Sequence, residues 1–290
     1  MKSKLIALFI IFVSSVQFAH AMDLKIATWN IYWLGSQNNQ RTPSDYEELK
    51  GYANQLDADV IALQEVESAE YALKVLGDKY SYVFTNNSGA QRVGIAYKPM
   101  QGYEYSAYEL AELDVGHVRP GIVFTIKNKA TGDSVDLLAL HLKSGCFQQR
   151  LNAANSPAAC EKFAKQVPVL KNWINQEIAN NKKFIILGDF NRRLNIEIRN
   201  SYSASEGAFK NFNTNIDGQQ NGLWIPNAGK SATCWNRKYP EFIDYFVASD
   251  SMKNAYVENS FSTLHYNGKF SQERMKALSD HCPISVKFAI

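Results

Sequence analysis

The chain of 290 residues is 46% hydrophobic and 12% aromatic, which is ordinary for a globular protein and excludes a low-complexity chain. Its formal net charge is +3, and two of its basic residues, Lys2 and Lys4, stand at the very start. This near-neutral balance excludes a protein that binds nucleic acid through overall positive charge, so affinity for a polyanion must come from a local cluster.

The first 21 residues have the pattern of a secretory signal peptide. Lys2 and Lys4 are followed by an uninterrupted apolar run, residues 5–13, and by the small-residue site Ala19-His20-Ala21, so we predict cleavage after Ala21. The run is too short for a permanent membrane span, and an uncleaved anchor helix is the weaker alternative. We expect an exported protein, secreted or periplasmic, with no stable membrane anchor after cleavage.

Strands and helices follow one another through the first half of residues 22–290. Thr42 is suited to cap a helix in which Pro43 takes the first position and apolar residues repeat at helical spacing up to Leu56. Thr131-Gly132-Asp133 is a hairpin turn signal. The other elements predicted here are a helix at 69–76 and strands at 25–30, 59–64, 80–85, 92–98, 122–127 and 134–142.

The second half predicts one long helix and further strands. The helix covers residues 160–180, and Pro168 implies a kink or a break within it. Residues 195–238 are polar and lack periodicity, so we interpret them as irregular connecting structure. Strands are predicted at 184–187, 242–248, 255–261 and 284–288. Because no linker or repeat is present and hairpins mix with helices, we predict a single mixed α/β domain over residues 22–290.

Four cysteines in an exported chain suggest two disulfides, for which three pairings exist. Cys146 and Cys160 flank a loop-like stretch rich in Asn, Ser, Ala and Pro, so we pair these two. Cys234 with Cys282 then follows by elimination. Closing the first loop stabilises the fold by about 3 kcal/mol in the chain-entropy model. None of the four stands in a recognisable nucleophile setting, so a catalytic cysteine is not expected.

Isolated polar residues stand at the ends of the apolar, strand-like runs. Buried strands tolerate carboxylates and imidazoles poorly unless a partner compensates them, so such ends suggest one shared polar site at the rim of a sheet. The residue types are those of hydrolysis at a phosphate with a hard metal ion. They are Asn30, Glu65, His141, Asp189, Asn191, Asp244, Asp280 and His281.

Glu65 follows an apolar strand, where its carboxylate would suit Mg²⁺, which prefers few protein oxygens. A surface glutamate just past a strand is the alternative. In Gly188-Asp189-Phe190-Asn191 the glycine permits a tight turn, and the period of two directs Asp189 and Asn191 the same way. The acid and the amide together can hold an attacking water and a phosphate oxygen, with a capped turn as the alternative.

Asp244 and His281 suggest an oriented base. A carboxylate that accepts the imidazole N–H fixes the tautomer, so the other ring nitrogen can take a proton from water. Asp280 precedes His281, and in an extended segment the two side chains diverge, which would let Asp280 face the metal. No phosphate-binding glycine loop, zinc-type Cys/His spacing or G-x-S-x-G motif is present.

Six segments, in this order, resemble the endonuclease/exonuclease/phosphatase superfamily, and its deoxyribonuclease I group in particular: TWNIYWL, LQEVES, HLKSG, LGDFNRR, FIDYFVAS and LSDHCPISV. The resemblance runs from about Leu24 to Phe288. It implies a four-layer α/β (α+β) sandwich, in which two packed mixed β-sheets are flanked by helices and the site lies at one rim. It also implies a secreted nuclease of bacterial type.

The resemblance implies a role for each motif residue. Glu65 is then a metal ligand, with Asn30 and Asp280 close to the metal and its waters. Asp189 and Asn191 position the nucleophile and the phosphate, and His281, oriented by Asp244, is the base. His141 donates to the phosphate or the leaving oxygen, and Arg119 clamps the phosphate. In one departure from the family, Gln91 stands where a glutamate backs the second histidine, which weakens the acid role of His141.

The resulting prediction is a Mg²⁺-dependent nuclease, with Mn²⁺ or Ca²⁺ as other candidate metals, that acts as a monomer on DNA and also on RNA, by endonucleolytic cleavage. Lys143, Arg192 and Arg193 lie beside the motifs and could grip flanking phosphates, or be ordinary solvated charge. One alternative is a phosphodiesterase or phosphatase for phospholipid or phosphoinositide head groups, with Trp224 and Trp235 as candidate membrane contacts. A non-catalytic binding module is disfavoured, since every catalytic position is filled.

Overall fold

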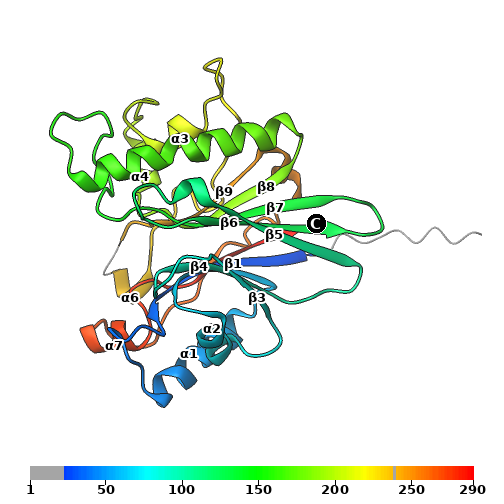
Figure 1. The fold of residues 1–290 in the computed structure, drawn as a ribbon, viewed down its shortest axis with the longest axis vertical. Coiled ribbons are helices and arrows are strands. Elements are labelled where there is room, and N and C mark those ends of the chain that lie inside the picture. Colours follow the sequence, from blue (N-terminus) through cyan, green and yellow to red (C-terminus); the bar gives the residue numbers. More distant parts are fainter. Residues whose placement is uncertain (1–22, 238–239) are drawn as a thin grey trace, which may run out of the picture.

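Two β-sheets pack face to face and carry helices on their outer sides, which makes four layers (Figure 1). This computed structural model describes residues 23–237 and 240–290, so the predicted signal peptide lies outside the described residues. Each sheet contains both parallel and antiparallel pairs. The predicted four-layer sandwich of two mixed sheets is therefore confirmed.

The first sheet has six strands in the order β10-β11-β1-β2-β4-β3. Only β1 and β2 run parallel to each other, so both end at the same rim of this sheet. The strands are β1 (Asp23–Leu34), β2 (Val60–Val66), β3 (Ser81–Phe84), β4 (Arg92–Tyr97), β10 (Ser262–Thr263) and β11 (Ile284–Ala289).

The second sheet has five strands in the order β5-β6-β7-β8-β9. Here β7 and β8 are the parallel pair, and the antiparallel β9 begins where they end. The strands are β5 (Tyr103–Leu110), β6 (Gly121–Asn128), β7 (Ser134–His141), β8 (Lys183–Asp189) and β9 (Asp244–Ala248).

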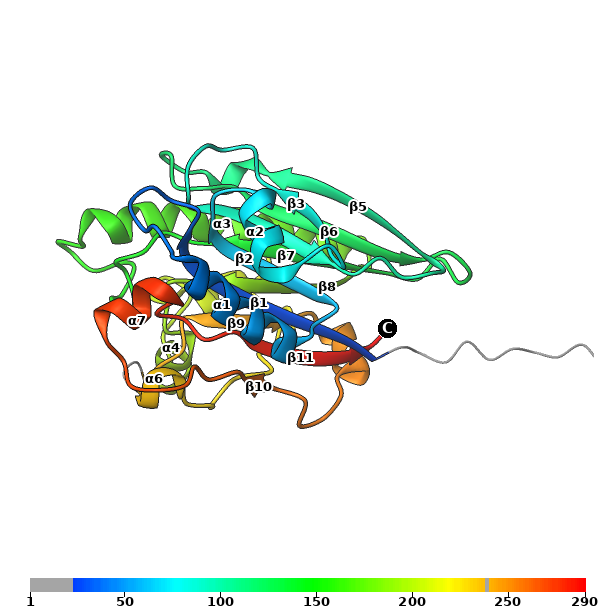
Figure 2. The same cartoon turned by 90° about the horizontal axis from the view of Figure 1, so that it is seen from below.

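Helices cover both outer faces. Figures 1 and 2 show α1 (Pro43–Leu56) and α2 (Ala69–Leu76) on the first sheet, and the long α3 (Ala158–Ala179) on the second. The shorter helices are α4 (Leu194–Arg199), α5 (Ala208–Phe212), α6 (Cys234–Arg237), α7 (Gln272–Ala277) and the 3₁₀ helices η1 (Ala111–Leu113) and η2 (Asp250–Ala255). Both α6 and α7 lie at the end of the sandwich opposite the C-terminus.

The alternation of side chains along β1 explains how one strand serves two layers. Leu24 and Ile26 lie in the core between the sheets, whereas Ala27 and Trp29 pack with α1 and α2 on the outer side. Successive residues of a strand point to opposite faces, so the even-numbered Asn30 continues the inner face toward the rim. The same period that builds the core therefore directs Asn30 to the space between the sheets.

The helix predictions hold in two informative cases. Thr42 caps α1, because its side chain accepts from the backbone N–H of Asp45 while the Asp45 carboxylate accepts from the backbone N–H of Thr42. Pro168 lies inside the uninterrupted helix α3, so the predicted option of a break is wrong. Burial of the Phe163 and Leu170 face of α3 against the second sheet compensates for the hydrogen bond that proline cannot make.

Other local predictions fail. Residues 255–261 are not a strand, because η2 ends at Ala255 and Tyr256 makes only an isolated bridge with Phe288. The segment 195–238 is not entirely irregular, since it contains α5, α6 and most of α4. The edge strand β5 and helix α7 were not predicted. In β5 most residues are exposed or half-buried, so its sequence lacks a clear apolar alternation.

Both predicted disulfides are confirmed. Cys146 bonds to Cys160 across a separation of 14 residues, and Cys234 bonds to Cys282 across 48 residues. The first fixes the loop after β7 to the start of α3, and the second fixes α6 to the segment that leads into β11. Two covalent links therefore hold the segments at one end of the sandwich.

Candidate active site

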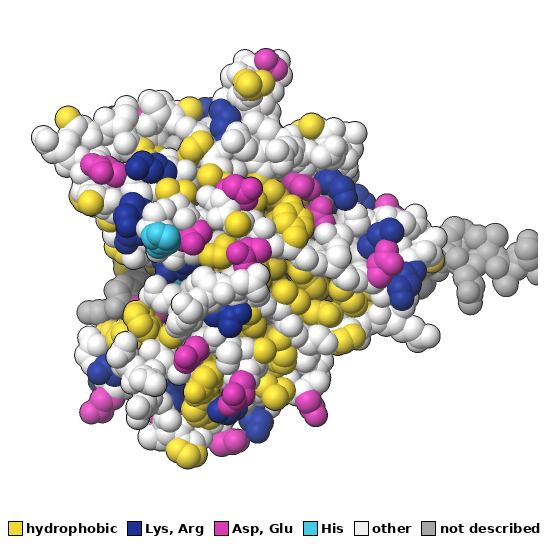
Figure 3. Space-filling view, viewed as in Figure 1, with side chains coloured by type: hydrophobic (Ala, Val, Ile, Leu, Met, Phe, Trp, Pro, Cys, Tyr) yellow, Lys and Arg dark blue, Asp and Glu magenta, His cyan; other side chains and the backbone are white. Residues whose placement is uncertain are grey.

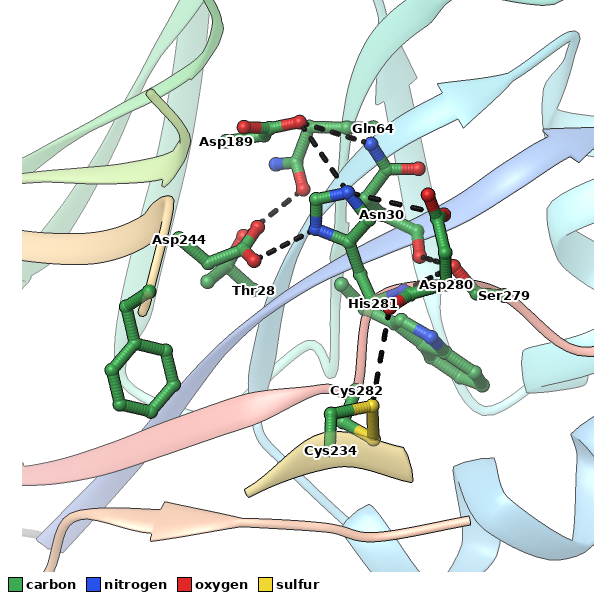
Figure 4. A network of polar contacts seen from close by, with 12 residues as sticks. Thr28, Asn30, Gln64, Asp189, Cys234, Asp244, Ser279, Asp280, His281 and Cys282 are labelled. Carbon is green, nitrogen blue, oxygen red and sulfur yellow. Dashed lines mark hydrogen bonds and ion pairs between the residues drawn. A yellow bond between two sulfur atoms is a disulfide. The ribbon is translucent and has the colours of Figure 1, made fainter. Parts of the chain in front are cut away.

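The predicted site residues converge at one rim, between the two sheets (Figure 4). Strands β1 and β2 of the first sheet end here, as do β7 and β8 of the second, whereas β9 and β11 begin here. The residues brought together are Asn30, Glu65, His141, Asp189, Asp244, Asp280 and His281, with Asn191 and Arg119 beside them. Residues up to 251 positions apart, Asn30 and His281, thus form one polar cluster.

Three site residues on neighbouring strands of the second sheet stand in direct register. The pairing of β7 with β8 sets His141 opposite Asp189, and the pairing of β8 with β9 sets Asp189 opposite Asp244. Residues paired across adjacent strands project to the same face, so the three side chains enter one space. All three are buried, and Asp189 is only 1% exposed.

Gly188 allows β7 and β8 to approach closely at this point. A Cβ atom at Gly188 would lie 2.1 Å from the carbonyl oxygen of Leu140, and its φ of +139° also disfavours other residues. The sequence pattern had placed Gly188 in a turn, but it lies inside β8. The glycine therefore allows the close strand pairing that sets His141 opposite Asp189, and it does not form a turn.

A β-bulge turns Glu65 into the site. The pairing of β2 with both neighbours shifts between Gln64 and Val66, so Glu65 is an extra residue, and its φ of +57° is left-handed. Without the bulge, alternation would direct Glu65 to the outer face with Leu63. A non-glycine residue in this region of φ is strained, and such strain is concentrated at functional sites.

Asn30 links the two sheets through its side-chain amide. The nitrogen Nδ2 donates to Oε1 of Glu65 and to Oδ2 of Asp189, each at 3.2 Å. The amide oxygen accepts from the backbone N–H of Tyr32 at 3.0 Å, which fixes the orientation of the group. Asn30 thus lies beside the predicted metal ligand Glu65 and donates one hydrogen bond to it.

His281 is held between three carboxylates (Figure 4). Its Nδ1 donates to Oδ2 of Asp244 at 2.7 Å, while its Nε2 lies 3.8 Å from Asp189 and 3.9 Å from Asp280. Burial acts to lower the pKa of His281, but Asp244, Asp280 and Asp189 together raise it well above its usual value. Asp244 thus fixes the orientation of the imidazole, and without a metal the three carboxylates favour its protonated form.

Asp189 and His141 lie side by side with shifted pKa values. Burial raises the pKa of Asp189 to about 7, although His281 opposes the shift. Burial, followed by Arg119, lowers the pKa of His141 well below its usual value, so this imidazole is neutral. Nε2 of His141 lies 3.4 Å from Asp189 and 3.7 Å from Glu65, whereas Nδ1 is buried without a partner.

Asn191 follows Asp189 in a left-handed conformation, with φ of +49°. Its backbone N–H donates to Oδ1 of Asp189 at 2.8 Å, and its Nδ2 donates to the carbonyl of Leu142 at 3.0 Å. An asparagine amide has two N–H groups, so one remains to donate to a phosphate oxygen. The structure thus brings Asn191 beside Asp189 as predicted.

Arg119 lies behind the site and holds the end of β7. Its Nε donates to the carbonyl of His141 at 2.9 Å, and one terminal nitrogen donates to the carbonyl of Leu142 at 3.3 Å. The other terminal nitrogen donates to Oε1 of Gln91 at 2.9 Å, so Gln91 contacts Arg119. Nδ1 of His141 is left without a backing group, which agrees with the departure from the family pattern at Gln91.

The carboxylates fit a divalent cation. Oε2 of Glu65 and Oδ1 of Asp280 are buried and have no hydrogen-bond partner, which is costly unless a cation or a proton compensates them. Carboxylate oxygens are the ligands that Mg²⁺ prefers. A second group, Asp189, Asp244 and His281, has ligand atoms within 4.8 Å of one another. Its Asp244 is hydrogen-bonded to His281, which leaves Glu65 and Asp280 as the residues that could hold the cation.

Several sequence interpretations need correction or addition. Arg192 cannot grip a flanking phosphate, because it is fully buried, where it pairs with Glu197 and donates to the carbonyl of Cys146. Its position next to Asn191 gave no sign of this burial. Ser279 was missed: its hydroxyl donates to the carbonyl of Asn30 at 2.7 Å and accepts from the backbone N–H of His281 at 3.0 Å.

Fold and site together have the features of hydrolases of phosphate esters: a double-sheet sandwich with carboxylates, two histidines and a buried arginine clustered at one rim. The chain belongs to the endonuclease/exonuclease/phosphatase family, whose model matches residues 27–281. This family typically depends on a divalent metal, and the acidic and histidine side chains at the rim fit that requirement. No match was found among curated proteins.

Solved structures with the same fold share little sequence with this chain. A humanized D. rerio TDP2 is 18% identical, with a TM-score of 0.60 over 92% of this chain and 99% of that one. The human Nocturnin catalytic domain with bound sulfate is 16% identical, with a TM-score of 0.53 over 92% and 93%. The 3′ phosphatase NExo from Neisseria, bound to a product DNA hairpin, is 16% identical, with a TM-score of 0.57 over 91% and 99%.

Proposed function

We propose that the protein is an exported, metal-dependent nuclease that hydrolyses phosphodiester bonds of DNA, and also of RNA, by endonucleolytic cleavage. The observation that carries the proposal is the hydrogen bond from His281 to Asp244, with the free nitrogen of the imidazole directed into the carboxylate site. Such a pair prepares a base for a water molecule, which is the group that phosphodiester hydrolysis requires.

In the proposed reaction, His281 in its neutral form takes a proton at Nε2 from a water molecule as the water oxygen bonds to phosphorus. Asp189, 3.8 Å from that nitrogen, holds the water in line with the leaving oxygen. The P–O bond to the leaving group breaks, His141 donates a hydrogen bond from Nε2 to the departing oxygen, and that oxygen takes up a proton from a second water molecule. Mg²⁺ at Glu65 and Asp280 would stabilise the negative charge that grows on the phosphate oxygens.

Arg119 and Asn191 are assigned to the phosphate. Arg119 is 5% exposed, and its charge interacts with both Asp189 and Glu65, so it contributes positive potential to a site otherwise lined by carboxylates. The spare N–H of Asn191 points from a fixed backbone beside Asp189. A donor that is already oriented stabilises the transition state without reorganisation.

Nucleic acid as substrate is supported by one relative and by the local charges. The Neisseria relative is a 3′ phosphatase bound to a DNA hairpin. On the face drawn in Figure 3, basic and acidic side chains are interspersed. Local contacts from Lys143 and Arg193, which are both partly exposed, would therefore hold the flanking phosphates.

Export as a monomer is part of the proposal. The signal-peptide pattern at residues 1–21 supports export, and so do the two disulfides, which persist in oxidising compartments. Among the described residues, no helix is both long enough and apolar enough to cross a bilayer.

A lipid head-group substrate is less well supported. Trp235, a candidate membrane contact, is 2% exposed and donates to the carbonyl of Ser279. Trp224 packs against Tyr256 and Phe288. Neither tryptophan offers an exposed apolar surface for insertion into a membrane.

The test incubates the purified protein, residues 22–290, with supercoiled plasmid, RNA, and sphingomyelin or phosphoinositide vesicles, with Mg²⁺ or with EDTA. We expect nicked and then linear plasmid with Mg²⁺, no cleavage with EDTA, and loss of cleavage in His281→Ala. His117→Ala, at an exposed histidine, is the matched control. Hydrolysis of the lipids with intact nucleic acids would refute the proposal, as would normal turnover by a folded His281→Ala variant.

A further inference from the structure

A cavity of about 240 Å³ opens directly beside the proposed base. His281, Asp244 and Asp280 form its inner side, so a group that enters it is adjacent to the phosphate being cleaved. The walls are mainly apolar and come from segments that are distant in sequence. The apolar part consists of Phe147, Ala232, Phe242, Ile243 and the disulfide Cys234–Cys282. The lining is completed by Arg193, Glu241 and Thr263.

Disulfides hold the walls in place. Phe147 directly follows Cys146, which is bonded to Cys160, and Cys282 directly follows His281. Phe242 packs edge-on against Phe261 and Tyr245, which fixes its ring. The cavity is therefore part of a rigid surface, and a ligand need not order it on binding.

Arg193 and Glu241 add one charge of each sign to the lining of the cavity, and Glu241 is already paired with Arg199. Arg193 lies 5.8 Å from the centroid of the Phe147 ring and donates to Oε1 of Gln148 at 2.8 Å. The expected ligand group is thus mainly apolar, and Arg193 offers a contact for an anionic neighbour. Its size is limited, because pockets for drug-sized ligands begin at about 300 Å³.

We propose that this cavity receives the nucleobase of a nucleotide next to the cleaved phosphate, stacked on Phe242 and Phe147. The inference rests on the proposed nuclease function and names its preferred substrate. A base has an aromatic face that stacks on phenylalanine, and the next phosphate of the strand would meet Arg193. A lipid tail lacks both features.

A base can enter the cavity only when it is not stacked and paired in a duplex. Extruding a base from a duplex costs a few kcal/mol, whereas a base in a single strand is already free to turn. The protein is therefore a nuclease that favours single-stranded over double-stranded nucleic acid. Stacking of one base on aromatic side chains changes binding by about tenfold or more, which is large enough to measure.

The experiment uses a single-stranded oligonucleotide in which one phosphodiester is cleavable and the others are phosphorothioates. The base on either side of that bond is present or replaced by hydrogen. We expect the protein to cleave the base-bearing strand with about tenfold higher kcat/KM on one side, and a duplex more slowly than the single strand.

Two variants test the walls. In Phe242→Leu and Phe147→Ala, kcat/KM for the base-bearing strand should approach kcat/KM for the base-free strand. Cleavage of the base-free strand should be retained. Phe209→Leu, on α5, is the matched control and should keep the ratio. Phe147 is partly exposed, so its variant should fold even where Phe242→Leu does not.

The outcomes separate the inference from the function on which it rests. Equal kcat/KM with and without the base, on both sides, would overturn the cavity assignment and leave the nuclease intact. An unchanged preference in a folded Phe147→Ala and Phe242→Leu double variant would do the same. No cleavage of any strand with Mg²⁺ would instead remove the nuclease itself.

Discussion

The imidazole of His281 and the carboxylate of Asp244 are joined at 2.7 Å across the two sheets. Asp244 is the first residue of β9 in the second sheet, whereas His281 lies in the segment that enters β11 of the first. Because the base and the group that orients it come from different layers, their contact depends on how the sheets pack. The position of the base thus depends on the packing of the two sheets and not on the conformation of a single loop.

Replacement of the orienting carboxylate should separate its role from that of the base. We expect Asp244→Asn to lower kcat by about 10²- to 10⁴-fold with little change in KM, because the fixed tautomer and the basicity of His281 are lost. Steady-state kinetics at several pH values give the measurement. An exposed aspartate, Asp250, provides the matched Asn control. Near-normal kcat in the first variant would argue against His281 as the base.

Glu65→Gln should remove cation binding while preserving the fold. The buried Oε2 of Glu65 has no protein partner, so a neutral amide in its place loses the charge that attracts the metal. Calorimetric titration with Mg²⁺, and the rise of Tm with added Mg²⁺, report binding without any turnover. Glu47→Gln, on the exposed face of α1, should bind Mg²⁺ as the parent does. Unchanged binding by Glu65→Gln would place the metal elsewhere.

The stability of the metal-free protein should fall as the pH rises toward neutrality. The pKa of Asp189 in the folded protein is about 7, above its usual value of 3.8, because burial disfavours its charge. Protonated Asp189 therefore contributes stability that is complete below pH 4 and is lost as the pH rises through 7. Since one pKa unit corresponds to about 1.4 kcal/mol, the effect amounts to a few kcal/mol.

Asp189→Asn isolates this effect. The variant carries no charge at any pH, so its free energy of unfolding in EDTA, from urea titrations, should decline less between pH 4 and 7 than that of the parent. His281 also has a raised pKa, and its protonated form contributes stability in the same direction, so some decline persists in both proteins. Parallel profiles for the two proteins would show that Asp189 is ionised throughout.

Arg41 should be a positioning residue for the same site. Its guanidinium donates to the carbonyls of Ile31 and Tyr32, just after Asn30, and to those of Ala277 and Leu278, just before Ser279. It thus ties the end of β1 to the segment that carries His281. Burial lowers the pKa of Arg41 to about 10, which still leaves it charged at neutral pH.

A lysine cannot reach four carbonyls from one ammonium, so Arg41→Lys should lower the free energy of unfolding by about 1–3 kcal/mol. We also expect a reduced kcat with KM nearly unchanged, because the displaced group is the base and not the phosphate contacts. Arg199→Lys, at an exposed ion pair with Glu241, should cost less than about 1 kcal/mol. Equal effects of the two substitutions would remove the positioning role.

The strand ends were predictable because the period of two and the apolar runs carry that information. His141, Asp189 and Asp244 each follow or open a buried strand, and the rule that such ends meet at a rim placed them together. The direction of the Glu65 side chain was not predictable, because regular alternation points it to the outer face and only the bulge reverses this direction. A bulge depends on the pairing of two partner strands, which one sequence segment does not encode.

The burial of charged side chains was the second feature that the sequence did not predict. Arg192 and Arg193 are adjacent and alike in sequence, yet one is fully enclosed beside Glu197 and the other lines the cavity. The difference comes from the turn after β8, which directs them apart. Likewise β5 is an edge strand with few buried residues, so tertiary pairing with β6, and not local pattern, makes it a strand.

The alignment of His141, Asp189 and Asp244 across three strands limits how descendants of this chain can vary. Insertion of one residue into β7, β8 or β9 would turn the matching side chain to the opposite face and disable hydrolysis in a single step. Loops beyond the rim carry no such restriction, so their lengths can drift while the chemistry stays constant. We therefore expect homologous proteins to differ in the loops that contact the substrate. The lengths of β7, β8 and β9 should stay the same, because they keep these three residues aligned.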